Sequence, residues 1–510
     1  MSKVRVRFAP SPTGPLHMGG VRTALFNYLF AKKQGGEFIL RIEDTDQTRY
    51  VPGAEQYIMD SLKWCGLPYS EGPDVGGPYG PYRQSERKAI YKQYADQLIA
   101  SGNAYFAFDT PEELDQLRKK YESEKAVFVY NFETRKSLRN SLTMPDADVQ
   151  ALINSGAHYV VRFKMPENFD VVMQDIIRGQ VTFNTKELDD KVLYKSDGLP
   201  TYHLANVVDD HLMLITHVIR GEEWLSSMPL HVLLYKAFGW QDTMPQFAHL
   251  PLILKPIGQG KLSKRDGDKM GFPVFPLLWV DQTTGEQSSG YRESGYFPEA
   301  FVNMLALLGW NPGTEQEIFS MEELIEAFDL SRVGKSGSKF DPEKTKWFNH
   351  QYMLKKSDSE IAELFQVYLA AKNIHAELAY TERVVRMVKE RAVFVHEIWD
   401  QGFYFFQTPA EYDVQSVKKR WKEGVPEIMQ EILALLQGFS GNWIAADIKE
   451  KFSEFVTEKG WGFGVVMNAF RICLVGAAVG PDLFEICEMI GREETLLRIQ
   501  NGLSKIEVPK

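Results

Sequence analysis

The sequence is poor in cysteine and in long apolar runs, and each absence argues against a class of protein. Its 510 residues include three cysteines, at positions 65, 473 and 487, and no CxxC pair. This usage argues against a disulfide framework or a zinc knuckle and indicates a reducing cytosol. No apolar run is long enough to span a bilayer, and the opening MSKVRVRF lacks the apolar core of a signal peptide. We therefore expect a cytoplasmic protein without a membrane partner.

An excess of positive charge is also missing, because the formal net charge is −10 at pH 7. A nucleic-acid partner would have to meet local basic patches rather than a positive field of the whole protein. The remaining composition, 44% hydrophobic and 25% charged, is typical of a soluble globular chain. The length is sufficient for roughly three or four domains.

The N-terminal residues predict a strand–helix–strand unit. Residues 3–8 alternate as a strand does, residues 21–33 place apolar side chains on one helix face before two glycines, and residues 37–44 form a second strand pattern. Such a unit implies a parallel sheet with a binding site at its carboxyl edge.

Further patterns divide the rest of the chain. Thr110 begins a helix capping box with a proline at the first helical position, and residues 158–195 are strand-rich. We expect a buried strand over 205–224 and an amphipathic helix over 227–240. Residues 272–292 resemble a surface insertion with a turn at Thr284-Gly285, which we expect to be passive decoration. Helices are predicted at 53–65, 84–101, 359–371, 380–398, 427–438, 442–459, 463–478 and 482–490.

Strands followed by a long helical tail predict a multidomain protein with an α/β part and an all-α part. The fold class expected is a Rossmann-like doubly wound parallel sheet with an inserted α+β domain, followed by a helical C-terminal half. The predicted boundaries are 1–82 with 206–260 for the sheet domain, 83–205 for the insertion, 261–350 for a connecting region, and 351–510 for the helical region.

One loop concentrates residues suited to binding phosphate. Prolines 10, 12 and 15 stiffen residues 9–20, and the glycines there let a ligand approach the backbone. The helix that follows offers unpaired N–H groups and the positive end of a dipole. His17 would donate a hydrogen bond to a phosphate oxygen; the alternative is a tight turn whose histidine only satisfies the backbone.

A second candidate is the basic loop at residues 260–269, GKLSKRDGDK. Its lysines and arginine, flanked by glycines, fit a phosphate clamp, and the alternative is a solvated charged turn.

Together the two loops resemble the paired signatures of the class I aminoacyl-tRNA synthetases. More closely, the blocks APSPTGPLHMGGVRTALFNYLFA, FILRIEDTD, GPYGPYRQSER, GLPTYHLANVVDDH and VIRGEEW resemble the glutamyl-tRNA synthetase family, bacterial type. The resemblance spans roughly the first half of the chain, and the helical second half is similar to an anticodon-binding region. It implies a cytoplasmic, monomeric glutamate–tRNA ligase that uses ATP with Mg²⁺ and has L-glutamate, ATP and tRNA(Glu) as partners.

The resemblance also implies which residues carry the chemistry. His17 and Lys264 would be catalytic, since adenylate formation needs positioning and charge stabilisation more than covalent help. The ATP-binding residues would be Pro10, Gly14, His17, Gly19, Gly20, Lys261, Ser263, Lys264 and Arg265. The implied glutamate-binding residues are Arg7, Ala9, Ser11, Glu43, Tyr202, Asn206 and Arg220.

The charges of glutamate agree with these binding residues, because its two carboxylates need cations and its ammonium needs an anion. The resemblance gives Arg7 and Arg220 as the cations and Glu43 as the anion. Each has a bland alternative: Arg7 as a solvated edge residue, Glu43 as a helix cap, and Tyr202 and Asn206 as core and turn residues.

Many relatives carry a cysteine-based zinc knuckle in the inserted domain, whereas here Ala107 and Asp109 stand at the expected cysteine positions. We therefore expect no metal ligands and no structural zinc. Residues 83–205 would bind the tRNA acceptor end, 261–350 would contact its stem, and 351–510 would bind the anticodon. The insertion at 272–292 is either a further contact to the acceptor stem or passive decoration, and we expect the latter. Arg383 and Arg386 are the candidate tRNA contacts, with a solvated helix face as the alternative.

Two other functions remain as alternatives. A glutaminyl-tRNA synthetase would have an anticodon half resembling β-barrels, and a nucleotidylyltransferase sharing the His17 loop would not need a chain of this length. The sequence does not decide whether tRNA(Gln) is also charged with glutamate, or which residues read the anticodon.

Overall fold

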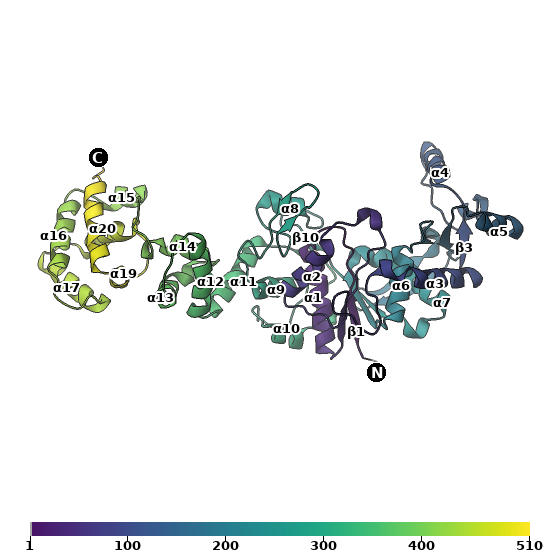
Figure 1. Ribbon diagram of the computed structural model, residues 1–510, viewed down its shortest axis with the longest axis horizontal. Coiled ribbons are helices and arrows are strands. Elements are labelled where there is room, and N and C mark those ends of the chain that lie inside the picture. The colour runs from purple at the N-terminus through teal and green to yellow at the C-terminus, as the bar shows by residue number, and fades with distance from the viewer. Residues whose placement is uncertain (1–2, 510) are drawn as a thin grey trace. The chain divides into compact units, whose positions relative to one another are not determined.

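A computed structural model describes residues 3–509 (Figure 1). The chain divides into two compact units, Met1–Thr345 and Lys346–Lys510. Within the described residues, every strand lies in the first unit and the second unit is helical. This confirms the expected order of an α/β part followed by an all-α part, with the division five residues before the predicted boundary. Across residues 3–509, the helices are too short or too polar to cross a bilayer.

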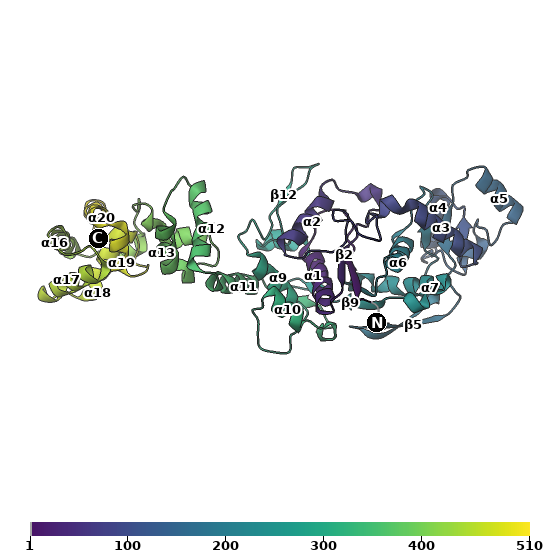
Figure 2. The same ribbon diagram turned by 60° about the horizontal axis from the view of Figure 1, so that its bottom comes forward.

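The predicted strand–helix–strand unit is present at the N-terminus. It consists of β1 (Arg5–Phe8), α1 (Met18–Lys33) and β2 (Glu37–Leu40), and the two strands pair in parallel. The turn after α1 depends on glycine, because Gly35 has a φ of 59° and a Cβ on Gly36 would lie 2.4 Å from the carbonyl oxygen of Val4. Figure 2 shows α1 beside β2, which it covers.

Two strands from the middle of the sequence continue this sheet. β8 (His217–Gly221) and β9 (Gln246–Leu250) pair in parallel. The backbone N–H of Thr216, just before β8, donates to the carbonyl of Arg5 in β1 at 2.9 Å, which places β8 beside β1. The chain therefore moves outward in one direction from β1 to β2 and in the other from β8 to β9. Ligands of open α/β sheets bind at the carboxyl edge of such a switch point.

The segment expected as an insertion, 83–205, contributes to two sheets. β5 (Asp170–Asp175) pairs with β9 and with β6 (Gly179–Asn184), so its later part extends the central sheet. The rest forms a separate antiparallel sheet in the order β3-β4-β7. The strands of this sheet are β3 (Ala104–Ala107), β4 (Val160–Phe163) and β7 (Val192–Tyr194). The same segment forms the helices α3 (Lys88–Ala100), α4 (Pro111–Ser123) and α5 (Asp146–Asn154). The predicted capping box at Thr110 begins α4.

Asp109 lies just after β3, where relatives would carry a cysteine. One carboxylate oxygen accepts a hydrogen bond from the hydroxyl of Tyr130 at 2.9 Å, and the other accepts from the backbone N–H of Arg139 at 3.0 Å. Hydrogen bonds to one carboxylate thus connect three parts of the chain around the end of β3.

The strand expected over 205–224 is wrong for its first half. Residues 202–212 form helix α6 (Tyr202–Leu212), and only β8 at the end of that range is a strand. Every residue from Leu204 to Asp210 is buried, which resembles a buried strand, but Leu204, Val207, Val208 and Leu212 recur at the three- and four-residue spacing of a helix. The strand prediction therefore chose the wrong period. The amphipathic helix predicted next is present as α7 (Met228–Phe238).

Helix α6 is fixed to the start of α3 by one buried carboxylate. Asp209 accepts hydrogen bonds from Arg87 Nε at 2.8 Å, Tyr91 Oη at 2.7 Å and Gln84 Nε2 at 2.9 Å. A buried charge is tolerable only when its lone pairs are satisfied in this way, so these contacts hold the two helices in one relative position.

The predicted basic loop at 260–269 is only partly a loop. Helix α8 (Lys264–Met270) begins inside it, because Ser263 and Asp266 form a capping box. Around α8 the chain also forms β10 (Ile253–Leu254), β11 (Trp279–Val280), β12 (Gln287–Ser288), α9 (Pro298–Leu307), α10 (Met321–Ala327), β13 (Ser338–Lys339) and α11 (Pro342–Lys355). Helix α2 (Ala54–Trp64), predicted at 53–65, follows β2 earlier in the sequence.

The segment 272–292 is not passive decoration. It forms the β11–β12 hairpin, with the predicted turn at Gly285 (Figure 2). Its start packs on the beginning of α1: the Val274 carbonyl accepts from Met18 N–H at 2.8 Å, and the ring of Phe275 meets His17 edge-on at 6.1 Å. The segment therefore supports the His17 loop.

The second unit is a set of packed helices. The prediction of one helix over 380–398 is wrong, because α13 (Leu378–Val388) is followed by a 3-10 turn at Lys389–Arg391 and α14 (Glu397–Gly402) begins only at Glu397. The Glu397 carboxylate accepts from the N–H groups of Val393 and Phe394 in the segment between the two helices. Helices α15 (Val414–Arg420) and α20 (Arg492–Lys505) were not predicted. The helices are α12 (Asp358–Ala371), α13 (Leu378–Val388), α14 (Glu397–Gly402), α15 (Val414–Arg420), α16 (Val425–Gln437), α17 (Ala445–Glu458), α18 (Phe463–Val475), α19 (Leu483–Ile490) and α20 (Arg492–Lys505).

Candidate active site

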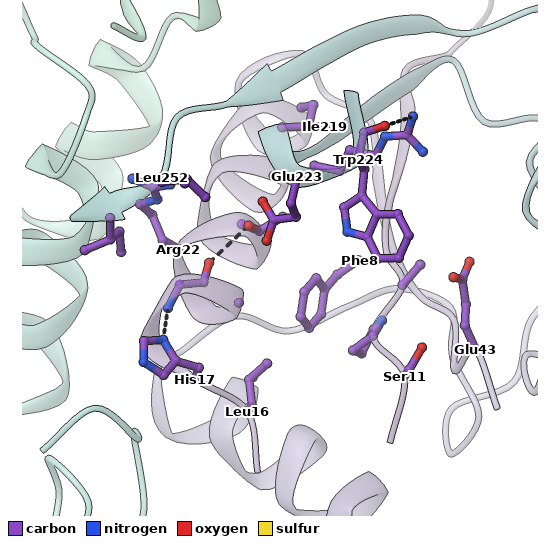
Figure 3. A pocket seen from close by; sticks show the side chains of 18 of the residues that line it. Phe8, Ser11, Leu16, His17, Arg22, Glu43, Ile219, Glu223, Trp224 and Leu252 are labelled. Carbon is purple, nitrogen blue, oxygen red and sulfur yellow. Dashed lines mark hydrogen bonds between the residues drawn. The ribbon is translucent and has the colours of Figure 1, made fainter. Parts of the chain in front are cut away.

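A cavity of about 550 Å³ opens at the carboxyl ends of β1 and β8, where the strand order reverses (Figure 3). Figure 3 shows His17 and Glu43 on different sides of it, with Phe8 and Trp224 between them. The predicted site residues that line the cavity are Arg7, Ala9, Pro10, Ser11, His17, Gly19, Gly20, Glu43, Tyr202, Asn206, Arg220 and Lys261. The predicted residues that do not line it are Gly14, Ser263, Lys264 and Arg265, which all lie within the described part of the chain.

His17 is the N-cap of α1 and holds a donor without a partner. Its Nδ1 accepts the N–H of Gly19 at 3.2 Å, so the proton of the neutral ring lies on Nε2. Burial, with a smaller effect of the nearby Lys261 charge, lowers the pKa of His17 to about 4, which keeps the ring neutral near pH 7. Nε2 is buried and meets no hydrogen-bond partner among residues 3–509. A ligand oxygen that accepts from it would satisfy a group whose isolation costs roughly 1–3 kcal/mol.

The first N–H groups of α1 were expected to be unpaired, but the structure pairs them. Met18 donates to the carbonyl of Val274, Gly19 donates to the ring of His17, and Gly20 donates to the carbonyl of His17. The protein thus satisfies these first N–H groups itself. The imidazole Nε2–H and the helix dipole, rather than free backbone donors, are what α1 offers an anion.

The glutamate-binding residues predicted at the strand ends belong to a buried network of four charges. Arg7 donates to both oxygens of Asp210, at 3.0 and 3.2 Å, and Arg41 donates to Asp210 at 2.8 Å and to Glu43 at 2.9 Å. Asn206 adds a hydrogen bond of 3.0 Å to the same oxygen, Oε1, of Glu43. Burial raises the pKa of the Glu43 carboxyl, and the adjacent guanidinium groups oppose that shift. Among the described residues no donor contacts Oε2 of Glu43, so this oxygen is available for a cationic ligand.

Arg220 faces the same cavity from β8. Its Nη1 donates to the hydroxyl of Tyr202 at 2.7 Å, and its Nη2 donates to the carbonyl of Trp224 at 3.2 Å. The Trp224 and Tyr202 rings pack 4.5 Å apart. Burial raises the pKa of Tyr202, so its hydroxyl keeps its proton and can donate to a ligand. The result is a cation and a hydroxyl donor side by side.

The helical conformation of α6 explains how three side chains reach this pocket. Tyr202, Asn206 and Asp210 are four residues apart, so they lie along one helix face. Asp210 and Arg41 were not predicted as site residues. Arg41 directly follows β2 in the block FILRIEDTD, and a charged side chain between the apolar Leu40 and Ile42 was a signal that could have drawn attention to it.

Carboxylates engage two lysines of the basic loop, of which Lys261 lines the cavity and Lys264 does not. Lys261 donates to Glu223 at 2.7 Å, and Lys264 donates to Glu286 of the β11–β12 hairpin at 2.5 Å. Both lysines and both carboxylates are partly exposed. Ion pairs of this kind contribute about 0–1 kcal/mol, so an anionic ligand can replace the carboxylates at little cost.

The two predicted tRNA contacts lie on α13 in the second unit. Arg383 donates to Glu488 at 2.7 Å, and Arg386 contacts Asp358 at 3.2 Å and Glu382 at 3.4 Å. Both arginines are exposed, so their ion pairs are weak and can be exchanged.

Comparisons with known proteins agree with this geometry. Residues 3–347 match the family of class I tRNA synthetases (E and Q), catalytic domain, and residues 360–503 match an anticodon binding domain. The chain is a class I tRNA synthetase, with a Rossmann-type catalytic part followed by a helical anticodon-binding region.

The relatives narrow the family further. The chain is 58% identical over 506 residues to a glutamate–tRNA ligase of Christiangramia forsetii, covering 99% of this chain and 100% of the relative. It is 59% identical over 507 residues to that of Flavobacterium johnsoniae, with the same coverage. A solved glutamate–tRNA ligase from Elizabethkingia meningosepticum, in complex with its amino acid, is 54% identical with a TM-score of 0.97, covering 99% of this chain and 100% of that one. The chain therefore belongs to the glutamate–tRNA ligase family.

Proposed function

We propose that this ligase activates L-glutamate with ATP, releases pyrophosphate, and transfers the glutamyl group to the terminal adenosine of tRNA(Glu). The observation that supports this most directly is the joint placement of Arg220, Glu43 and His17 around one cavity. A cation, an anion and a neutral donor in this order suit the side-chain carboxylate, the ammonium and a phosphate, respectively.

In this proposal glutamate binds through both of its ends. Its side-chain carboxylate accepts from Arg220 and from the hydroxyl of Tyr202. Its ammonium donates to Oε2 of Glu43, whose other oxygen is held by Arg41 and Asn206. Arg7 adds positive charge behind the pocket but shares it with Asp210. Ala9 and Ser11 form the wall beside β1.

The reaction is an in-line displacement at the α-phosphorus. An oxygen of the α-carboxylate forms the new P–O bond, the bond to the bridging oxygen of the β-phosphate breaks, and pyrophosphate leaves with the electron pair. His17 donates its Nε2–H to a phosphate oxygen, while Lys261 and Lys264 release their carboxylate partners to neutralise the phosphates, with Ser263 and Arg265 nearby. Mg²⁺ carried on the triphosphate supplies further charge neutralisation, which needs few protein ligands.

The direct test is ATP–pyrophosphate exchange with purified protein, glutamate and tRNA(Glu). We expect exchange with glutamate, dependent on tRNA as the family resemblance implies. Exchange with glutamine in place of glutamate would overturn the proposal. Charging assays with purified tRNA(Glu) and tRNA(Gln) would then define the range of tRNA substrates.

The pair between Lys264 and Glu286 gives a first prediction. We expect Glu286→Gln to lower the KM for ATP by up to about fivefold, because it removes an exposed carboxylate that competes with phosphate for Lys264. The measurement is initial-rate kinetics with varied ATP at saturating glutamate. Glu315→Gln, at an exposed glutamate, is the control and should leave this KM unchanged. A higher KM for ATP in Glu286→Gln would mean that the hairpin assists binding instead.

A second prediction concerns zinc. We expect metal analysis of protein prepared without chelators to find no tightly held zinc, because Ala107 and Asp109 replace the knuckle cysteines and Asp109 is engaged by Tyr130 and Arg139. One zinc per chain that survives dialysis would contradict this.

A third prediction concerns the tRNA regions. In this proposal residues 83–205 bind the acceptor end, and the helical region from about residue 351 binds the anticodon. We expect Arg383→Gln combined with Arg386→Gln to weaken tRNA binding and to reduce the slope of log affinity against log salt by up to about two. The measurement is a binding titration at several salt concentrations. An unchanged slope would remove these arginines from the phosphate contacts.

A further inference from the structure

Arg220 is held by three protein groups, and one of them lies behind the pocket. Besides Tyr202 and Trp224, which engage its two terminal nitrogens, its Nε donates to Nε2 of His249 at 3.0 Å. A guanidinium has five N–H donors. Among the described residues these bonds use three of them, which leaves one N–H on each terminal nitrogen of Arg220. Two parallel N–H groups are the arrangement that binds a carboxylate in bidentate fashion.

His249 has its protonation fixed by its two neighbours. Its Nε2 accepts from Arg220 and therefore carries a lone pair, so the ring proton lies on Nδ1. Nδ1 is 2.6 Å from Oδ2 of Asp175 and donates to it. The His249 and Asp175 side chains have no solvent-exposed surface, and burial lowers the pKa of His249, which keeps the ring neutral.

Asp175 is itself fixed by the backbone. Its Oδ1 accepts from the N–H groups of Ile177 at 2.9 Å and Arg178 at 2.8 Å, and its Oδ2 accepts from the N–H of His249 at 3.1 Å. Burial raises the pKa of the Asp175 carboxyl, but the hydrogen bond from the His249 ring and those from the backbone N–H groups of Arg178 and Ile177 outweigh it and lower the pKa, so the carboxyl stays ionised.

The three residues lie on three neighbouring strands. Arg220 on β8 is the register partner of His249 on β9, and β5, which ends at Asp175, pairs with β9 on its other side. A chain of hydrogen bonds therefore runs across the sheet from a carboxylate with a fixed position to the pocket. Rigid strands hold such an array more accurately than loops do.

We propose that His249 and Asp175 are positioning residues for amino-acid recognition: they fix the orientation of Arg220 so that its two remaining N–H groups meet the side-chain carboxylate of glutamate. This inference rests on the proposed role of Arg220. It also gives a source of specificity. Two rigidly held N–H groups can donate to the two oxygens of the glutamate carboxylate, whereas glutamine places an NH₂ donor opposite one of them.

The test compares two substitutions of His249 with a control substitution of His217. His249→Leu removes both hydrogen bonds, and His249→Gln can accept from Arg220 and donate to Asp175 with one amide. His217→Gln is the control, at a partly buried histidine on the neighbouring strand β8 whose ring contacts Thr216. Exchange assays with tRNA present give kcat and KM for glutamate and for ATP. We expect His249→Leu to raise the KM for glutamate by about 10–100-fold with the KM for ATP within about twofold, His249→Gln to recover most of the loss, and His217→Gln to resemble wild type.

Further outcomes separate this inference from the proposed function. Asp175→Asn supplies a second variant if His249→Leu fails to fold, and it should raise the same KM. If Arg220→Leu raises the KM for glutamate while both His249→Leu and Asp175→Asn leave it unchanged, the positioning role is overturned and the glutamate site stands. If Arg220→Leu itself leaves that KM unchanged, the role of Arg220 fails, and this inference fails with it. A loss in His249→Leu that affects glutamate and ATP equally would indicate a structural role only.

Discussion

His17→Asn should melt at the same temperature as the wild-type protein and yet activate glutamate about 10²–10³-fold more slowly. The asparagine oxygen can accept the N–H of Gly19, as Nδ1 of His17 does, and asparagine is among the preferred N-cap residues. What the substitution removes is the buried Nε2–H, which has no protein partner among the described residues. Single-turnover rates of adenylate formation and thermal melting measure the two effects separately.

His17→Ala is the matched comparison, because it removes the cap as well as the donor. We expect the same loss of rate together with a decrease of about 1 kcal/mol in stability. The buried ring of Phe275, not a second imidazole, packs against His17, and Gly20 stands where a second histidine would complete the signature. A His17→Asn protein with the wild-type single-turnover rate would remove His17 from the mechanism.

Arg220→Leu should raise the KM for glutamate at least about 30-fold, the equivalent of about 2 kcal/mol, with a much smaller effect on the KM for ATP. The substitution leaves a desolvated substrate carboxylate without its cation. Arg220→Lys keeps the charge but loses the planar pair of donors, so we expect it to recover only part of the loss. The measurement is steady-state exchange with glutamate and ATP varied in turn.

The remaining cations cannot easily compensate for this loss. Arg7 and Arg41 are already paired with Asp210 and Glu43 inside the protein. An unchanged KM for glutamate in a folded Arg220→Leu protein would move the carboxylate site to Arg7.

Local features of the sequence predicted the strand–helix–strand unit and drew attention to the His17 loop, whereas the roles of Arg7 and Glu43 came from the family resemblance. Prolines and glycines mark the loop, and the two strands pair in parallel as expected. These signals work because they depend on residues close together in the chain. The same reasoning predicted the α4 capping box, the turn at Gly285 and most helices of the second unit.

The features that the sequence did not reveal depend on burial or on distant partners. Helix α6 is buried throughout residues 204–210, and such a run resembles a buried strand even though Leu204, Val207, Val208 and Leu212 have helical spacing. Asp175 and His249 are 74 residues apart, and only the sheet brings them together behind Arg220. The first N–H groups of α1 were expected to be free, but the carbonyl that occupies one of them belongs to Val274, far along the chain.

Neighbouring aspartates on α6 give this helix two different connections. Asp210 accepts from Arg7 and Arg41 beside the cavity, whereas Asp209 accepts from Gln84, Arg87 and Tyr91 at the start of α3. A displacement of the start of α3 would therefore act on α6, which carries Tyr202 and Asn206 into the cavity.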